Sequence, residues 1–126
     1  MTALTDFDAA FARCPLVAIL RGVRPDEVEA IGDALVDAGF TLLEVPMNSP
    51  DPLDSVARLA RRFAGRAVVG AGTVLRPEDV AAVEAAGGTM VISPNANPAV
   101  IAATAAAGLV SLPGISTPSE AFAALG

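Results

Sequence analysis

The amino-acid sequence predicts an α/β fold, a (β/α)8 TIM barrel of which only about five N-terminal βα units are present. The first observation is a set of short, continuous apolar runs, which are typical of parallel strands buried on both faces. The second is that segments with helical spacing of apolar residues separate these runs. The third is an internal repeat of one helix plus one strand. The expected strands span 17–22, 41–47, 67–73, 89–94 and 109–114.

The expected helices have recognisable ends. Proline is tolerated at a first helical position, where its missing N–H needs no partner. Glycine after the last apolar residue of a helix can adopt the left-handed conformation that ends it. The prolines at expected helix starts are Pro25, Pro77, Pro98 and Pro118. The glycines at expected helix ends are Gly39, Gly65, Gly87 and Gly108.

The repeat decides between two parallel folds. Segments 24–46 and 76–94 are near copies, and 97–114 is a looser third. Such a succession implies a parallel sheet with right-handed crossovers. An open doubly wound sheet usually binds a nucleotide at a glycine-rich turn after its first strand, but RGVRPDE has a single glycine there. GAGTVL at 70–75 lacks the third glycine of a dinucleotide fingerprint. The barrel is therefore favoured.

Residues 1–126 are expected to be the N-terminal part of one barrel domain. A complete eight-unit barrel needs at least about 200 residues, and the five units here use all 126. Five parallel strands alone would leave both sheet edges unpaired and an interior face uncovered. We therefore expect a truncated sequence or an incomplete gene product.

The composition excludes several classes of partner. A net charge of -6, with no lysine, argues against nucleic acid or an anionic membrane surface. The apolar stretch at 99–115 is broken by glycine and proline, so it is not expected to span a membrane. Lone Cys14 and an acidic N-terminus make the cytoplasm the default location. With no histidine and no acid cluster at the strand ends, neither a metal nor a cofactor is expected.

Several other residues are interpreted as structural. Cys14 has no histidine to activate it and is expected to be a small buried residue. The five phenylalanines, Met47 and Met90 are expected in the core. An arginine cluster is expected on the solvated face and end of the second helix; it comprises Arg58, Arg61, Arg62 and Arg66.

Polar residues gather at the expected strand ends, where barrels place their chemistry. Arg21 closes the first strand, Glu44 lies near the end of the second and Thr73 closes the third. Consecutive strands are neighbours, so Arg21 is expected to approach Glu44. One interpretation is a structural ion pair at the mouth. The other is a site for a small anionic substrate, in which the guanidinium holds a carboxylate and the acid moves protons. Further residues expected at this rim are Pro46, Ser93, Pro94, Asn95 and Pro113.

Five motifs in order, AILRGV, EVPMNSP, GAGTVL, SPN and PGISTPSEAF, resemble the 2-keto-3-deoxy-6-phosphogluconate and 6-phosphogalactonate aldolase family from about residue 16 onward. The resemblance implies an eight-stranded barrel, commonly a homotrimer. It also implies metal-free cleavage of a phosphorylated 2-keto-3-deoxy sugar acid into pyruvate and glyceraldehyde 3-phosphate through a lysine Schiff base. Asn48 makes the chain more similar to the phosphogalactonate branch, because phosphogluconate enzymes usually have arginine there.

The resemblance implies a role for each candidate site residue. Glu44 would be the catalytic general acid/base, with apolar neighbours that raise its proton affinity. Arg21 would contact the keto-acid end of the substrate, Thr73 would add a binding hydroxyl, and Pro94 with the PGIST turn would line the pocket.

One departure from the family concerns the nucleophile. The family's Schiff-base lysine lies on a sixth strand, past the end of this chain, and the chain has no lysine. Two alternatives therefore remain open: a related aldolase that splits 4-hydroxy-2-oxoglutarate, and a non-catalytic partial barrel that folds against a partner chain.

Overall fold

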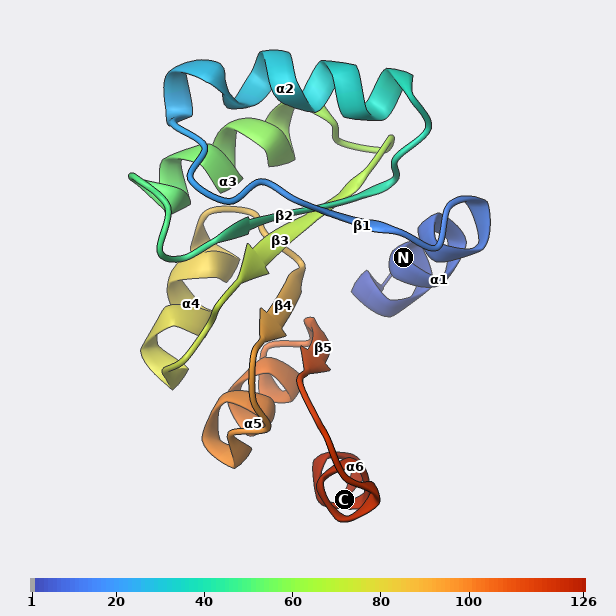
Figure 1. Ribbon diagram of the computed structural model, residues 1–126, viewed down its shortest axis with the longest axis vertical. Coiled ribbons are helices and arrows are strands. Elements are labelled where there is room, and N and C mark those ends of the chain that lie inside the picture. The colour runs from blue at the N-terminus through green and yellow to red at the C-terminus, as the bar shows by residue number, and fades with distance from the viewer. Residues whose placement is uncertain (1) are drawn as a thin grey trace.

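The computed structural model describes residues 2–126 as six helices around a five-stranded parallel sheet (Figure 1). The strands are β1 (Val17–Ile19), β2 (Leu42–Pro46), β3 (Val68–Gly72), β4 (Met90–Ser93) and β5 (Val110–Pro113). The helices are α1 (Ala3–Arg13), α2 (Pro25–Asp37), α3 (Pro52–Arg62), α4 (Pro77–Ala85), α5 (Pro98–Ala106) and α6 (Pro118–Leu125). The order in the sheet follows the order in the chain, β1-β2-β3-β4-β5. The prediction of alternating strands and helices with a parallel sheet is confirmed.

Local sequence signals set the helix ends. Each of α2 to α6 begins with proline at its first position, including α3, whose Pro52 the sequence analysis did not use. The glycines expected at helix ends all have positive φ, from 71° to 108°. The additional helix α1 was not predicted; the hydroxyl of Thr2 caps it by accepting a hydrogen bond from Thr5 N–H at 3.1 Å.

The two faces of the sheet pack against different helices. On one face, alternate strand residues such as Leu43, Val45 and Val69 join side chains of α2 to α5 in the main core. The opposite face, which we call the inner face, carries Leu42 and Val68 against helix α1. Figure 1 shows α2 to α5 following one another around the convex side of the curved sheet, with α1 on the other side. This arrangement is that of a barrel wall.

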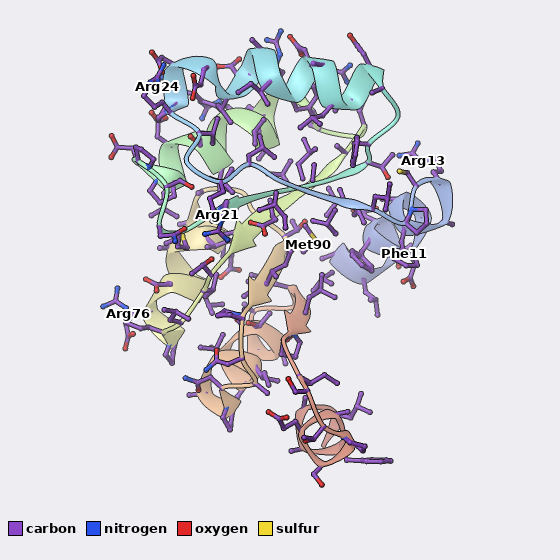
Figure 2. All side chains as sticks on the ribbon, in the orientation of Figure 1. Phe11, Arg13, Arg21, Arg24, Arg76 and Met90 are labelled. Atoms are coloured by element: carbon purple, nitrogen blue, oxygen red, sulfur yellow. The ribbon has the colours of Figure 1, made fainter. Side chains whose placement is uncertain are left out.

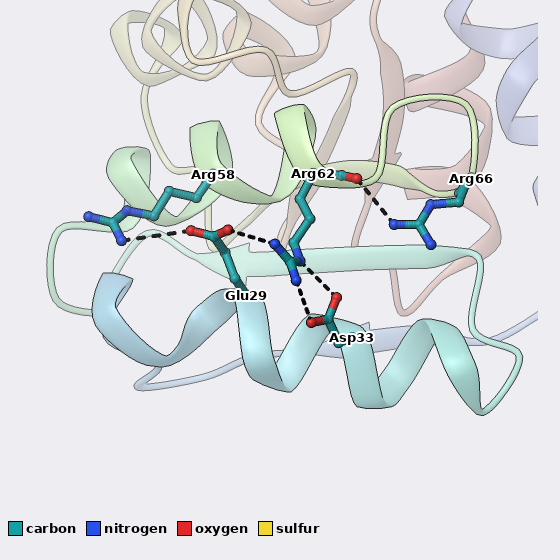
Figure 3. Close-up of polar contacts among 5 residues, drawn as sticks. All are labelled: Glu29, Asp33, Arg58, Arg62 and Arg66. Atoms are coloured by element: carbon teal, nitrogen blue, oxygen red, sulfur yellow. Dashed lines mark hydrogen bonds and ion pairs between the residues drawn. The ribbon is translucent and has the colours of Figure 1, made fainter.

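An ion-pair network joins α2 to α3 on the outside of the wall (Figure 3). Arg62 donates to both carboxylate oxygens of Asp33 at 2.7 Å and to Glu29 at 3.3 Å. Arg58 also lies 3.8 Å from Glu29. The arginine cluster expected only to be solvated therefore also connects two helices.

Two phenylalanines differ from their prediction as core residues. Phe11 is 48% exposed and Phe122 is 75% exposed, whereas Phe63 is fully packed in the core. Phe122 lies on α6, a helix without a buried residue.

Candidate active site

Glu44 lies in the middle of β2, between Ile19 of β1 and Gly70 of β3. It stands two residues after Leu42, so it shares the inner face of the sheet with that residue. The side chain is only 4% exposed, although it is a carboxylate. Burial of this kind is costly for an ionised acid.

The surroundings of Glu44 favour its protonated form. Desolvation raises the pKa of Glu44 from its ordinary 4.5 to about 7, while the charge of Arg21 and the backbone amide of Gly72 act in the opposite direction. Its Oε2 atom is buried without a hydrogen-bond partner. A buried oxygen without a hydrogen-bond partner is rare in folded proteins. A group whose pKa is close to neutral pH can both give and take a proton.

The expected contact between Arg21 and Glu44 is wrong in its detail. The two side chains form no ion pair within 4.0 Å in the part of the chain that the structure describes. Strand β1 ends at Ile19, the partner of Glu44, so Arg21 already lies in the following loop. Arg21 lies near the carboxyl end of β2 (Figure 2). There its Nη1 donates to Oδ1 of Asn48 at 3.3 Å. Arg21 therefore acts on Glu44 through its charge and stays exposed.

Thr73 and Pro94 lie at the carboxyl ends of β3 and β4. Thr73 directly follows β3 and has φ 54°, a left-handed conformation that is unusual for a β-branched residue. Strained backbone of this kind is concentrated at functional sites. Pro94 is exposed just beyond β4. Both residues are at the end of the sheet where Arg21 lies, as predicted.

Buried hydroxyls hold the loops of this end together. Ser49 Oγ accepts a hydrogen bond from the backbone N–H of Gly22 at 3.1 Å, which joins the loops after β1 and β2. The hydroxyl of Ser93 donates to the carbonyl of Val74 at 2.8 Å, which joins the ends of β3 and β4. These serines are thereby accounted for as structural groups that position the rim.

Gly72 is the residue of this site that the sequence analysis missed. A Cβ atom built on Gly72 would lie 2.2 Å from Oε2, 2.5 Å from Cδ and 2.5 Å from Oε1 of Glu44. The side chain of Glu44 therefore occupies the space above the Gly72 backbone. The sequence did contain a signal, because GAG within a buried apolar run places two glycines on the same face of a strand.

Neither of two hollows on the molecule is lined by Glu44. One, of about 490 Å³, runs beside β1 and α2 and includes Arg21. The other, of about 520 Å³, lies between α1 and the start of β3, and none of Arg21, Glu44, Thr73 and Pro94 lines it. No group of three metal-ligating side chains occurs within residues 2–126. The buried carboxyl group of Glu44, with its raised pKa and unpartnered oxygen, thus defines the candidate site better than the depth of a hollow.

A comparison with known families adds an independent observation. The family model described as aldolase, KDPG and KHG aldolase, matches residues 7–126. The chain belongs to the KDPG and KHG aldolase family. Within this family it is 46% identical over 110 residues to a probable 2-dehydro-3-deoxy-6-phosphogalactonate aldolase of Rhizobium meliloti (strain 1021), covering 87% of this chain and 52% of that protein. It is 42% identical to the 2-dehydro-3-deoxy-6-phosphogalactonate aldolase of Escherichia coli (strain K12), covering 90% of this chain and 55% of that protein.

Solved structures of aldolases have the same fold. A native KDPGal structure superposes with a TM-score of 0.87 at 42% identity, over 90% of this chain and 55% of that one. A KDPG aldolase from Legionella pneumophila, with pyruvate captured as a covalent carbinolamine intermediate, gives a TM-score of 0.84 at 28% identity, over 94% and 57% of the two chains. The chain described here spans about half the length of the curated relatives it matches.

Proposed function

We propose that this chain provides the acid/base half of a class I aldolase that cleaves 2-dehydro-3-deoxy-6-phosphogalactonate, or its gluconate epimer, to pyruvate and glyceraldehyde 3-phosphate. The observation that carries the proposal is Glu44, a buried carboxyl group with a pKa of about 7 and a buried oxygen that has no partner. Family membership and the relatives named for the phosphogalactonate reaction support this choice of substrate.

The chemistry needs a proton carrier of this kind. A lysine amine condenses with the keto carbon of the substrate and releases water, which leaves an iminium ion. Loss of the proton from the C4 hydroxyl then lets the C3–C4 bond break. C4 leaves as the aldehyde carbon of glyceraldehyde 3-phosphate, and the electron pair of the broken bond moves into the iminium to form an enamine. The enamine takes up a proton at C3, and hydrolysis releases pyruvate. Glu44 is proposed to move protons in these steps, because its pKa near 7 suits both directions.

Three further residues are proposed to hold the substrate. Arg21 is exposed and has no carboxylate within ion-pair distance among residues 2–126, so its guanidinium can bind the carboxylate of the keto acid. Thr73 is proposed to add a hydroxyl contact, and Pro94 to line the pocket wall. All three lie at the carboxyl end of the sheet, where barrel enzymes bind their substrates.

The nucleophile of the proposed reaction is not among these residues. The 126 residues contain no lysine, so the Schiff base has to be formed by a residue outside them. The carbinolamine captured in the Legionella pneumophila relative supports covalent catalysis in this family. We propose accordingly that residues 1–126 are the N-terminal part of a single barrel domain, in a cytoplasmic homotrimer without a cofactor. No helix within residues 2–126 has the length and apolar character needed to cross a membrane.

The test is pyruvate formation by the protein expressed from its full coding sequence. The phosphogalactonate substrate is expected to be cleaved, and Glu44→Gln is expected to lower kcat by about 10²-fold or more. Glu29→Gln, which changes a half-exposed glutamate in the outer network, is the matched control and should keep the rate. Absence of pyruvate, or a full rate with Glu44→Gln, would contradict the proposal.

A second candidate substrate is 4-hydroxy-2-oxoglutarate, because the matching family model names KHG aldolase as well. This substrate has a carboxylate where the sugar acid carries its phosphorylated chain. Comparing kcat/KM for the two substrates on the same preparation distinguishes the candidates. A preference for 4-hydroxy-2-oxoglutarate would replace the first assignment, and no cleavage of either would favour a non-catalytic partial barrel.

A further inference from the structure

Gly72 is a glycine whose backbone does not require glycine. Its φ lies outside the left-handed region, and it is the last residue of a regular parallel strand paired with Pro46. Any residue with a side chain can adopt such a conformation. The explanation for glycine at this position therefore has to come from the space above the strand.

Thr73, the next residue, has the opposite mismatch between residue type and backbone conformation. Thr73 has φ 54°, a conformation in which glycine would be relaxed and threonine is strained. The chain thus has glycine where the backbone is extended and a β-branched residue where it is left-handed. Backbone geometry alone would favour the opposite order.

The space above Gly72 is occupied by the carboxyl group of Glu44. A Cβ at Gly72 would lie within 2.5 Å of Cδ and both oxygens of that group, closer than any real non-bonded contact. On the opposite side of β2 from Gly72, Glu44 is paired with Ile19 of β1, which is 59% exposed. A displaced carboxyl group would therefore move away from β3 and toward water.

We propose that Gly72 is a positioning residue, whose missing side chain keeps the carboxyl group of Glu44 buried against β3. This role deepens the proposed function and rests on it for its catalytic meaning, because Glu44 is the proposed proton carrier. The position of the Glu44 carboxyl group is a structural property that can be measured without catalysis. Arg21 is the charged group that acts on Glu44 from the neighbouring loop, and it is unchanged by substitutions at Gly72.

The first test is a carbon-13 NMR titration of the Glu44 carboxyl carbon, assigned with Glu44→Gln. In Gly72→Ala the pKa of Glu44 is expected to fall from about 7 toward its ordinary 4.5, because the carboxyl group gains water. Gly88→Ala is the matched control, since its added methyl would meet Val83 Cγ1 at 2.7 Å and not Glu44. This control is expected to lower stability and leave the titration unchanged. An unchanged titration in Gly72→Ala would overturn the proposal.

The second test remains informative if Gly72→Ala does not fold. In Gly72→Ala/Glu44→Asp the shorter acid leaves room for the methyl group, and in Gly72→Ala/Glu44→Ala the carboxyl group is removed. Both double variants are expected to recover most of the urea midpoint that Gly72→Ala loses. An equal loss with and without the Glu44 side chain would overturn the proposal.

The same variants separate this inference from the proposed function. If Gly72→Ala shifts the titration but Glu44→Gln keeps full pyruvate formation in the full-length protein, Gly72 positions Glu44 and the catalytic assignment fails. If Glu44→Gln abolishes the reaction while Gly72→Ala leaves the titration and the pH profile of kcat unchanged, the catalytic assignment holds and the positioning role fails.

Discussion

The guanidinium of Arg21 donates a hydrogen bond to Asn48 Oδ1 at 3.3 Å, which holds it on the rim above Glu44. This contact joins the loops that follow two neighbouring strands, β1 and β2. It leaves a positive charge close enough to influence Glu44 without neutralising it in a direct ion pair. The relationship gives a first prediction about electrostatics.

Removing the charge of Arg21 should make Glu44 a weaker acid. The Arg21 guanidinium lowers the pKa of Glu44 against the larger effect of desolvation, so Arg21→Ala is expected to raise it above about 7. The measurement is the carbon-13 titration of the Glu44 carboxyl carbon. Arg24→Ala is the control, because Arg24 pairs with Asp26 and Glu27 at the start of α2. A lower pKa of Glu44 in Arg21→Ala would contradict the effect assigned to the Arg21 charge.

Glu44 should make the folded state less stable as the pH rises. Its folded pKa of about 7 lies above the ordinary 4.5, so folding favours the protonated form. The contribution of Glu44 to the free energy of unfolding is fully present below pH 4.5 and is lost as the pH rises through about 7. The difference in pKa corresponds to roughly 3 kcal/mol of unfolding free energy, as an order of magnitude.

Urea unfolding across this range measures the effect. Glu44→Gln cannot ionise, so it should be more stable than the unmodified protein at about pH 8 and lose that advantage in acid. Asp37→Asn, on the outer helix α2, is a control for the general effect of one charge less. Parallel stability curves for Glu44→Gln and the unmodified protein would show that Glu44 ionises freely in the folded state.

Relaxing the backbone at Thr73 should separate stability from function. Thr73→Gly removes the strain of φ 54° and is expected to raise the free energy of unfolding by up to about 1 kcal/mol. It also removes the hydroxyl that is proposed to bind substrate, so KM should rise. Thr73→Ser keeps the hydroxyl and is expected to keep KM. Thermal unfolding tests the effect on stability, and steady-state kinetics test the effect on KM. A fall in stability with Thr73→Gly would contradict the inference that the Thr73 backbone is strained.

The pair of Arg62 and Asp33 should contribute a small stabilisation that depends on pH. Arg62 lowers the pKa of Asp33 below its ordinary 3.8, chiefly by hydrogen bonding. The contribution is therefore present above 3.8 and is lost as the pH falls through the lower folded value. Both side chains are partly exposed, so the effect is limited by solvent.

The comparison of Asp33→Asn with the unmodified protein by thermal unfolding tests this pair. The difference in Tm should be present at neutral pH and disappear in strong acid. Asp79→Asn, which removes the pair of Asp79 with Arg76 at the start of α4 instead of a pair between helices, provides a reference for a local contact. A difference in Tm that persists in acid would argue for packing and not charge.

Much of the fold could be predicted from the sequence because buried parallel strands leave a simple pattern. Each observed strand lies inside the apolar run predicted for it, and prolines and glycines mark most helix ends. The run at 17–22 was nevertheless longer than β1, which ends at Ile19. Leu20 is buried just beyond β1 and its N–H still donates to the carbonyl of Glu44 at 2.9 Å, so the apolar run continues past Ile19, and this displaced the expected position of Arg21.

The features of the fold and of the site that could not be predicted from the sequence depend on contacts between distant segments. Helix α1 begins at Ala3 and is followed by Cys14, so it lacks the proline and glycine signals that mark the ends of the other helices. The exposure of Phe122 depends on what packs over α6, which composition cannot show. Glu44 was identified as a buried acid from its neighbours in the sequence, whereas its contact with Gly72 arises across two strands.

Because every strand pairs with the one that precedes it in the chain, the sheet can grow in the direction of synthesis. Each new strand needs only the edge formed immediately before it, and no early strand has to wait for a late partner. The surroundings of Glu44 come from β1, β2 and β3 and the loops after them. Its burial against Gly72 can therefore be complete when little more than half of these residues have left the ribosome.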